Sequence, residues 1–188
     1  MAKAKIVTCW SAAGSVGRTT IALALAFELA QCGKKVLVID ADTYSPSMAL
    51  QLGLNSHPAG LAAACRLVSQ QRFDETELNR LSVKISSGGN SIRMLTGLSS
   101  ANRWPEVPSE IFDELTTFAS DYFDFIVLDV AAQIEPNLFN HSAAIVRNAV
   151  TLWAVGYSDF VIAISGSEPV AVSRFVSAYA DLVELSPL

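Results

Sequence analysis

A short stretch of small residues, Ser11–Thr20, contains the residue types that a phosphate-binding loop needs. It reads SAAGSVGRTT and lies between an apolar run and an Ala- and Leu-rich segment. Small side chains let several backbone N–H groups converge on one anion, and the N-terminus of a following helix adds favourable partial charge. Gly17 precedes Arg18 and Thr19, which would bring a cation to a phosphate and a hydroxyl to Mg²⁺. The loop therefore predicts phosphate binding, although a tight turn without a ligand would also use glycine and serine.

Three aspartates add a second chemical signal, because they stand where apolar runs end. Asp40 and Asp42 follow one such run and Asp129 closes another. The carboxyl ends of parallel strands meet at the sheet edge where ligands of open α/β sheets bind, and carboxylates there can hold a hydrated Mg²⁺ ion. A single aspartate at such a place is more often a helix cap or a loop anchor. Three of them, together with Thr19, favour a nucleotide and metal site.

The elements that must position these residues follow from the apolar pattern. Five short, almost continuously apolar runs are typical of strands in a parallel sheet that helices cover on both faces. They are Lys5–Trp10, Lys35–Ile39, Ile92–Leu95, Phe125–Val130 and Phe160–Ser165. Four helices are expected at Thr19–Cys32, Glu110–Ser120, Ile145–Val155 and Val170–Glu184. The alternation predicts an α/β fold of three layers, α/β/α, around a mostly parallel central sheet.

Local signals add three details to this pattern. Gly33 is placed to end the first helix in a left-handed conformation. Ser109 is expected to cap the helix that follows it, and the turn-rich run Ser86–Ser91 is expected to be a loop.

The composition fits one domain and excludes several classes of protein. The chain has 188 residues, of which 51% are hydrophobic and 16% charged. It is therefore not a disordered chain, a collagen-like repeat or a disulfide-stapled mini-protein. No apolar run reaches the roughly 18 residues of a membrane span, and the N-terminus does not resemble a secretory signal. Cys9, Cys32 and Cys65 are far apart, which predicts reduced thiols in a cytoplasmic protein and excludes iron–sulfur and zinc chemistry.

Charge is distributed unevenly along the chain. Residues 1–103 carry 11 Lys and Arg against 6 Asp and Glu, whereas residues 104–188 carry 2 against 12. A stretch that acidic repels phosphate backbones, so binding of nucleic acid is not expected.

The loop and the aspartates together resemble the deviant Walker A ATPases of the ParA/MinD type. That family has a loop of lysine, two glycines, any residue, glycine, lysine and threonine, then a strand ending Asp-x-Asp and a hydrophobic strand ending in Asp. The corresponding segments here are Ala13–Thr19, Val36–Asp42 and Phe125–Asp129. The likeness covers nearly the whole chain. It looks closest to an actinobacterial branch related to the CpaE/TadZ proteins, on the runs Arg18–Thr20, Asp40–Tyr44, Leu95–Leu98, Arg103–Pro105 and Arg147–Ala149.

This resemblance implies a P-loop NTPase fold, with ATP and Mg²⁺ as cofactors. The family's sheet order is 3-2-4-1-5, and its later strands have no match here. We therefore expect residues 1–188 to be a single, C-terminally truncated domain. The residues implied to wrap the phosphates with backbone N–H groups are Gly14, Ser15, Val16 and Gly17. In the same way Arg18 would neutralise the β- and γ-phosphates, Thr19 would ligate Mg²⁺ and Thr20 would contact the α-phosphate.

The resemblance assigns the three carboxylates to metal binding and catalysis. Asp40 and Asp129 would hold the water shell of Mg²⁺, while Asp42 would orient the attacking water. Asp42 and Arg18 are thus the expected catalytic residues. The likeness also implies a homodimer and partners from a localisation machinery, in the cytoplasm.

Two cations of the family pattern are altered, and this leaves two functions open. Arg18 replaces the lysine next to the threonine, and Ala13 replaces the lysine that reaches across the dimer. Arg147 could substitute for the second lysine, although a surface or helix-capping role fits it better. One hypothesis is an ATP-binding spatial regulator, for polar localisation or assembly of pilus, secretion or division machinery, with slow or defective hydrolysis. The other is a scaffold that binds no nucleotide. Whether the chain is an enzyme stays open.

Overall fold

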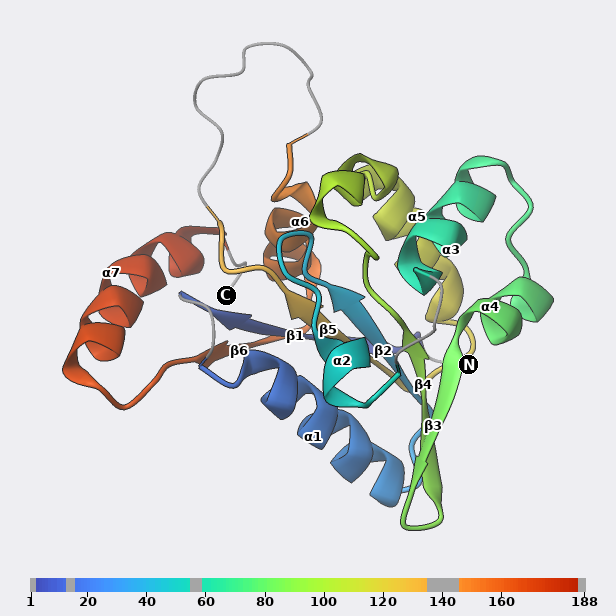
Figure 1. Cartoon of the computed structure of the whole chain (residues 1–188), viewed down its shortest axis with the longest axis horizontal. Coiled ribbons are helices and arrows are strands. Elements are labelled where there is room, and N and C mark those ends of the chain that lie inside the picture. The colour runs from blue at the N-terminus through green and yellow to red at the C-terminus, as the bar shows by residue number, and fades with distance from the viewer. Residues whose placement is uncertain (1–2, 13–15, 55–58, 135–145, 186–188) are drawn as a thin grey trace.

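The computed structural model describes residues 3–12, 16–54, 59–134 and 146–185. A six-stranded sheet runs through the described part of the chain, in the order β3-β4-β2-β5-β1-β6 (Figure 1). Its strands are β1 Lys5–Ser11, β2 Val36–Ala41, β3 Val83–Ser87, β4 Asn90–Leu95, β5 Phe125–Val130 and β6 Phe160–Ile164. Only β3 pairs in an antiparallel manner. The five expected strands occur in the predicted order 3-2-4-1-5, and the expected fold is confirmed.

Helices cover both faces of the sheet and form the outer two layers. They are α1 Arg18–Gln31, α2 Met48–Gln51, α3 Gly60–Ser69, α4 Glu75–Leu81, α5 Ser109–Ala119, α6 Ala149–Tyr157 and α7 Pro169–Leu185, with a 3₁₀ helix, η1, at Ala101–Glu106. Figure 1 shows α1 and α2 on one face, and α3, α5 and α6 on the other. Two apolar clusters match these faces, one around α1 and one under α3, α5 and α6.

The central strands show why the sequence pattern is continuous rather than alternating. Every residue of β2 is buried. Leu37 and Ile39 pack into the cluster under α3, α5 and α6, whereas Val36 and Val38 pack into the cluster around α1. Because successive side chains point to opposite faces, a strand between two helical layers needs apolar residues at nearly every position. This alternation also directs Asp40 toward the α1 face.

The boundaries of the first helix agree with its sequence signals. Gly17 precedes it with φ 89°, and Gly33 follows it with φ 77°. Both angles are left-handed, a conformation that glycine adopts without steric penalty. The prediction for Gly33 is therefore confirmed.

Two local predictions were wrong, and a third is not tested. The run Ser86–Ser91 is not a loop but the tip of the β3–β4 hairpin, where Gly88 and Gly89 both have positive φ. Two adjacent glycines are typical of a hairpin turn. The short strands on either side are polar near the turn, so they give little apolar signal in the sequence. Pro108 rather than Ser109 is the N-cap of α5, and Ser109 is the first helical residue. The start predicted at Ile145 lies outside the described residues, and the described helix α6 begins at Ala149.

Four helices were not anticipated, namely α2, α3 and α4 between β2 and β4, and η1 before α5. One of them, α4, carries a capping signal, because the Asp74 side chain accepts a hydrogen bond of 2.8 Å from the Glu77 backbone N–H. The chain between β2 and β4 is thus more ordered than its mixed composition indicates. None of the helices in the described ranges has the length and hydrophobicity to cross a membrane.

Candidate functional site

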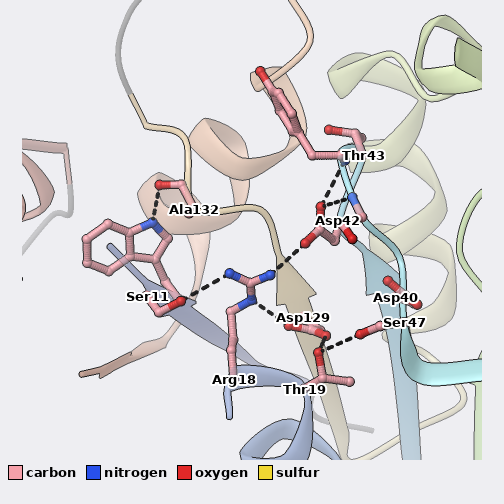
Figure 2. A network of polar contacts seen from close by, with 12 residues as sticks. Ser11, Arg18, Thr19, Asp40, Asp42, Thr43, Ser47, Asp129 and Ala132 are labelled. Atoms are coloured by element: carbon pink, nitrogen blue, oxygen red, sulfur yellow. Dashed lines mark hydrogen bonds and ion pairs between the residues drawn. The ribbon is translucent and has the colours of Figure 1, made fainter. Parts of the chain in front are cut away.

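The fold brings the predicted site residues to one edge of the sheet. β1, β2 and β5 run parallel and adjacent, so their carboxyl ends lie together. Asp40 and Asp129 are directly opposite each other in the register of β2 and β5. The chain leaves β1 at Ser11 and enters α1 at Arg18, which places the first turn of α1 beside both carboxylates (Figure 2).

The Arg18 guanidinium binds to side chains of the site through all three of its nitrogens. Its Nε donates to Asp129 Oδ1 at 2.8 Å, and Nη2 donates to Asp42 Oδ2 at 2.6 Å. Nη1 donates to the Ser11 hydroxyl at 3.1 Å, as Figure 2 shows. The Arg18 side chain is only 11% exposed. The guanidinium therefore forms two nearly buried ion pairs, which are geometrically specific because its donors are held in a plane.

The hydroxyl of Thr19 occupies the other side of Asp129. Thr19 Oγ1 donates to Asp129 Oδ2 at 2.5 Å and lies 3.1 Å from the Ser47 hydroxyl. Each oxygen of Asp129 thus accepts a hydrogen bond. Burial raises the pKa of Asp129, while Arg18 and Thr19 act in the opposite direction. These contacts stabilise the ionised carboxylate and oppose the effect of its own burial.

Asp40 has one satisfied and one unsatisfied oxygen. Oδ2 accepts from the backbone N–H of Met48 at 3.0 Å, whereas buried Oδ1 has no partner among the described residues. Burial, together with the nearby charge of Asp129, raises the pKa of Asp40 to about 7. A buried oxygen without a partner is suited to a bound water or a hydrated cation. Gly97 makes this position possible, since a Cβ there would lie 2.8 Å from Asp40 Cγ.

Asp42 holds the loop that follows β2. Its Oδ1 accepts 2.8 Å hydrogen bonds from the backbone N–H groups of Tyr44 and Ser45, while Oδ2 binds Arg18. Arg147 contacts the same loop, with Nη2 donating to the Thr43 carbonyl at 3.2 Å and its guanidinium carbon 3.9 Å from the Tyr44 ring centroid. The described contacts of Arg147 thus hold this loop, and its substitution for the lysine missing at Ala13 stays a prediction.

A cavity of about 350 Å³ opens in front of this group of residues. Its lining includes Gly17, Arg18, Thr19, Asp42, Tyr44, Ser45 and Ser47. Val16 and Thr20 do not line it, and Thr20 is exposed in the first turn of α1. Gly14 and Ser15 lie outside the described residues, so their predicted phosphate contacts stay predictions.

Two serines that were not predicted as site residues also contact the site. Ser11, at the start of the predicted loop, accepts from Arg18, and Ser47, in the segment after β2, lies against the Thr19 hydroxyl. Serine is common in loops, and only the topology shows which serines reach the site.

The donor set fits a Mg²⁺ ion that keeps several of its waters rather than a metal held by side chains alone. In the described ranges, no three carboxylate, imidazole or thiol groups are arranged to hold a metal. An ion would use the Thr19 hydroxyl, phosphate oxygens and water, with Asp40 and Asp129 binding the waters. Mg²⁺ prefers such a mixed oxygen shell.

A family model described as an AAA domain matches residues 4–162. The chain belongs to this AAA domain family. MinD, a septum site-determining protein of Synechocystis, is 29% identical over 171 residues, which are 88% of this chain and 61% of MinD. The chain thus spans less than two thirds of that relative. A ParA family ATPase from Chlorobium tepidum has the same fold, with a TM-score of 0.75 and 21% identity over 96% of this chain and 69% of the ATPase.

Another solved structure is MinD of Pyrococcus horikoshii complexed with Mg-ADP. It has a TM-score of 0.69 and 18% identity, and the match covers 96% of this chain and 65% of MinD. Together, the family match and these similarities support a ParA/MinD-type P-loop ATPase domain.

Proposed function

We propose that this chain is a spatial regulator of the ParA/MinD type that binds ATP and Mg²⁺ and hydrolyses ATP slowly or not at all. One observation carries the proposal: the first turn of α1 presents Arg18 and Thr19 to the strand-end carboxylates Asp42 and Asp129. The Synechocystis relative is named for determining the septum site, and the Pyrococcus relative was solved with Mg-ADP. Both support a nucleotide-dependent role in positioning cellular machinery.

In this proposal the chain keeps the parts needed to bind a nucleotide. Backbone N–H groups of Gly14–Gly17 and the N-terminus of α1 would bind the phosphates. Thr19 would ligate Mg²⁺, and Asp40 and Asp129 would hold its waters. Mg²⁺ would supply positive charge to the phosphate oxygens. Arg18 would face the β- and γ-phosphates, and Thr20 the α-phosphate.

The contacts of Arg18 suggest why hydrolysis would be slow. Asp42, the carboxylate proposed to orient the attacking water, is paired with the cation proposed to neutralise the phosphates. To reach a phosphate, Arg18 must give up its ion pairs with Asp42 and Asp129. Losing such pairs is unfavourable in a nearly buried site. Ala13 also supplies no cation, and a single cation acting on transition-state charge can change the rate by several orders of magnitude.

We further propose the finer features that the resemblance implies. These are a deviant Walker A loop, a homodimer, a cytoplasmic location and protein partners in a localisation machinery. Pilus or secretion assembly, as in the CpaE/TadZ branch, and cell division are the candidate processes.

Calorimetry with ATP and Mg²⁺ tests nucleotide binding directly. We expect a Kd in the micromolar range for the natural chain and none measurable for Gly17→Val. Gly33→Val is the matched control, because Gly33 also has a positive φ and open space around it but lies at the far end of α1. The control should bind ATP as the natural chain does, after circular dichroism shows that both variants fold. No heat and no change in Tm at millimolar ATP would contradict the proposal.

The second candidate function is a scaffold that binds no nucleotide. It is favoured by the same ion pairs, since the Asp42 and Asp129 carboxylates balance the charge of Arg18 within the protein. Sedimentation velocity separates the two functions. A regulator should change its oligomeric state when ATP and Mg²⁺ are added, whereas a scaffold should not.

A further inference from the structure

A groove separates α5 from α6 on the helical layer opposite α1. These two helices lie side by side in Figure 1. The groove has a volume of about 690 Å³ and shares no lining residue with the cavity at Arg18. We call it the α5–α6 groove, lined by α5 residues Ser109, Glu110, Asp113 and Glu114 and, around α6, by Val146, Ala149, Leu152, Trp153 and Tyr157.

The α6 side of the groove is apolar and held in place by ring contacts. Trp153 stacks on Tyr157 with ring centroids 5.7 Å apart, and it meets buried Phe112 edge-on at 5.1 Å. Its indole N–H donates to Asp113 Oδ1 at 3.1 Å. Tyr157 is nevertheless 72% exposed. Large aromatic side chains that are already ordered make good anchors for a partner, because little side-chain entropy is lost when it binds.

The α5 side of the groove is acidic. Glu110, Asp113 and Glu114 are spaced so that they share one face of the helix. None of the three forms an ion pair with another described residue. Residues 104–188 carry only two basic residues, and one of them, Arg147, holds the loop after β2. The groove therefore combines apolar anchors with uncompensated negative charge, which attracts cations.

We propose that the α5–α6 groove binds a segment of a partner protein that places Lys or Arg beside large apolar side chains. An amphipathic helix would lay its apolar side against Trp153 and Tyr157 and its basic side against the three carboxylates. A second copy of the chain fits poorly, because a two-fold contact through this groove would set the same acidic residues against each other. Nucleic acid is excluded by the same charge. This proposal goes beyond the proposed function and can be tested without added nucleotide.

A random peptide display library of about 12 residues, long enough for a helix of about 18 Å, tests the chemistry of the partner without assuming its identity. Selection uses the full chain, and binders that also bind Glu110→Lys/Glu114→Lys are removed. We expect the remaining peptides to carry net positive charge and at least two large apolar residues. Peptides that are acidic or uncharged, or an empty selection, would overturn the proposal.

Fluorescence anisotropy of one selected peptide then tests the site. We expect Glu110→Lys/Glu114→Lys to weaken binding about tenfold or more, and Tyr157→Ala to weaken it by several-fold. Glu28→Lys/Glu168→Lys is the matched control, since it changes the net charge equally at exposed positions on α1 and just before α7, and should bind as the natural chain does. Equal losses in the control, or none in the groove variants, would overturn the proposal. So would sedimentation in which Tyr157→Ala abolishes self-association, because the occupant would then be a second copy.

Discussion

Arg18 combines two demands that conflict in a single side chain. A phosphate-binding loop needs a free cation, yet the Arg18 guanidinium is shared between Asp42 and Asp129 and also binds Ser11. A lysine has one compact charge and could not form this planar set of contacts. The charge of Arg18 is therefore balanced by two carboxylates of the protein, and a phosphate would have to compete with them for the guanidinium.

Removing the negative charge of Asp42 should free Arg18 from one of its two ion pairs. We expect Asp42→Asn to lower the free energy of unfolding by about 2 kcal/mol, because a nearly buried charged hydrogen bond is lost. The same change should tighten ATP binding by several-fold in EDTA, since Arg18 has fewer contacts to give up. Denaturant unfolding and calorimetry measure the two effects.

Asp159→Asn is the control for that experiment, because it removes an ion pair with Lys5 far from the site. It should leave ATP affinity unchanged. ATP binding that is unaltered or weaker in Asp42→Asn would contradict the idea that the ion pair opposes nucleotide binding.

The three thiols differ in environment, and this gives a simple test of burial. Burial raises the pKa of Cys9 and of Cys65 to about 12 each, whereas Cys32 is exposed. Thiolate is the reactive form, so the two buried thiols should stay protonated and inert well above pH 8. We expect Ellman's reagent to modify one thiol in the folded chain and three in urea. Fast reaction of two or three thiols without denaturant would contradict the packing of β1 or α3.

At the scale of the elements, the loop after β2 links the Arg18 site to α6. Asp42 accepts hydrogen bonds from the Tyr44 and Ser45 backbone N–H groups, and Arg147, just before α6, contacts Thr43 and Tyr44. These contacts connect three segments that are distant in sequence. A change in the ion pairs of Arg18 would therefore alter the contacts that Arg147 makes just before α6.

Hydrogen exchange measures this connection. We expect Arg147→Ala to speed exchange at the Tyr44 and Ser45 amides, because the loop loses its contact with the guanidinium. Arg66→Ala on α3 is the control and should leave these amides unchanged. Unaltered exchange in Arg147→Ala would show that Asp42 alone orders the loop.

The close approach between the segment after β4 and Asp40 predicts a steric effect. A Cβ on Gly97 would lie 2.5 Å from Pro46 Cβ and 2.8 Å from Asp40 Cγ. We expect Gly97→Ala to lower the free energy of unfolding by about 1–3 kcal/mol in urea titrations. Gly166→Ala, where the added methyl meets one methyl group at 3.1 Å, is the milder comparison. A Gly97→Ala chain of natural stability would mean that this approach is looser than described.

The sequence predicts some of these elements because their signals are local. The buried strands are apolar at nearly every position, and Gly33 ends α1 as expected. The hairpin was missed because its strands Val83–Ser87 and Asn90–Leu95 have polar residues near the turn. The direct ion pairs of Arg18 could not be predicted, since Asp129 is 111 positions away and the parallel pairing of β1 with β5 brings it close.

At the scale of the whole molecule, the candidate nucleotide site and the candidate partner site lie on different surfaces. The sheet edge at the start of α1 carries the phosphate-binding residue types, and the α5–α6 groove lies on the opposite helical layer. Nucleotide binding and partner binding would then use different surfaces of one domain. The acidic character of residues 104–188 fits a protein partner rather than a nucleic acid.

The most direct test of the account follows the Arg18 side chain while ATP is added. Spectra of the ¹⁵N-labelled guanidinium Nε–H groups, with the Arg18 signal assigned by its loss in Arg18→Lys, report the hydrogen bond to Asp129. We expect this signal to shift as ATP and Mg²⁺ are titrated and to saturate with the Kd measured by calorimetry. An Arg18 signal that stays unchanged at millimolar ATP would contradict the claim that this site binds nucleotide through its arginine.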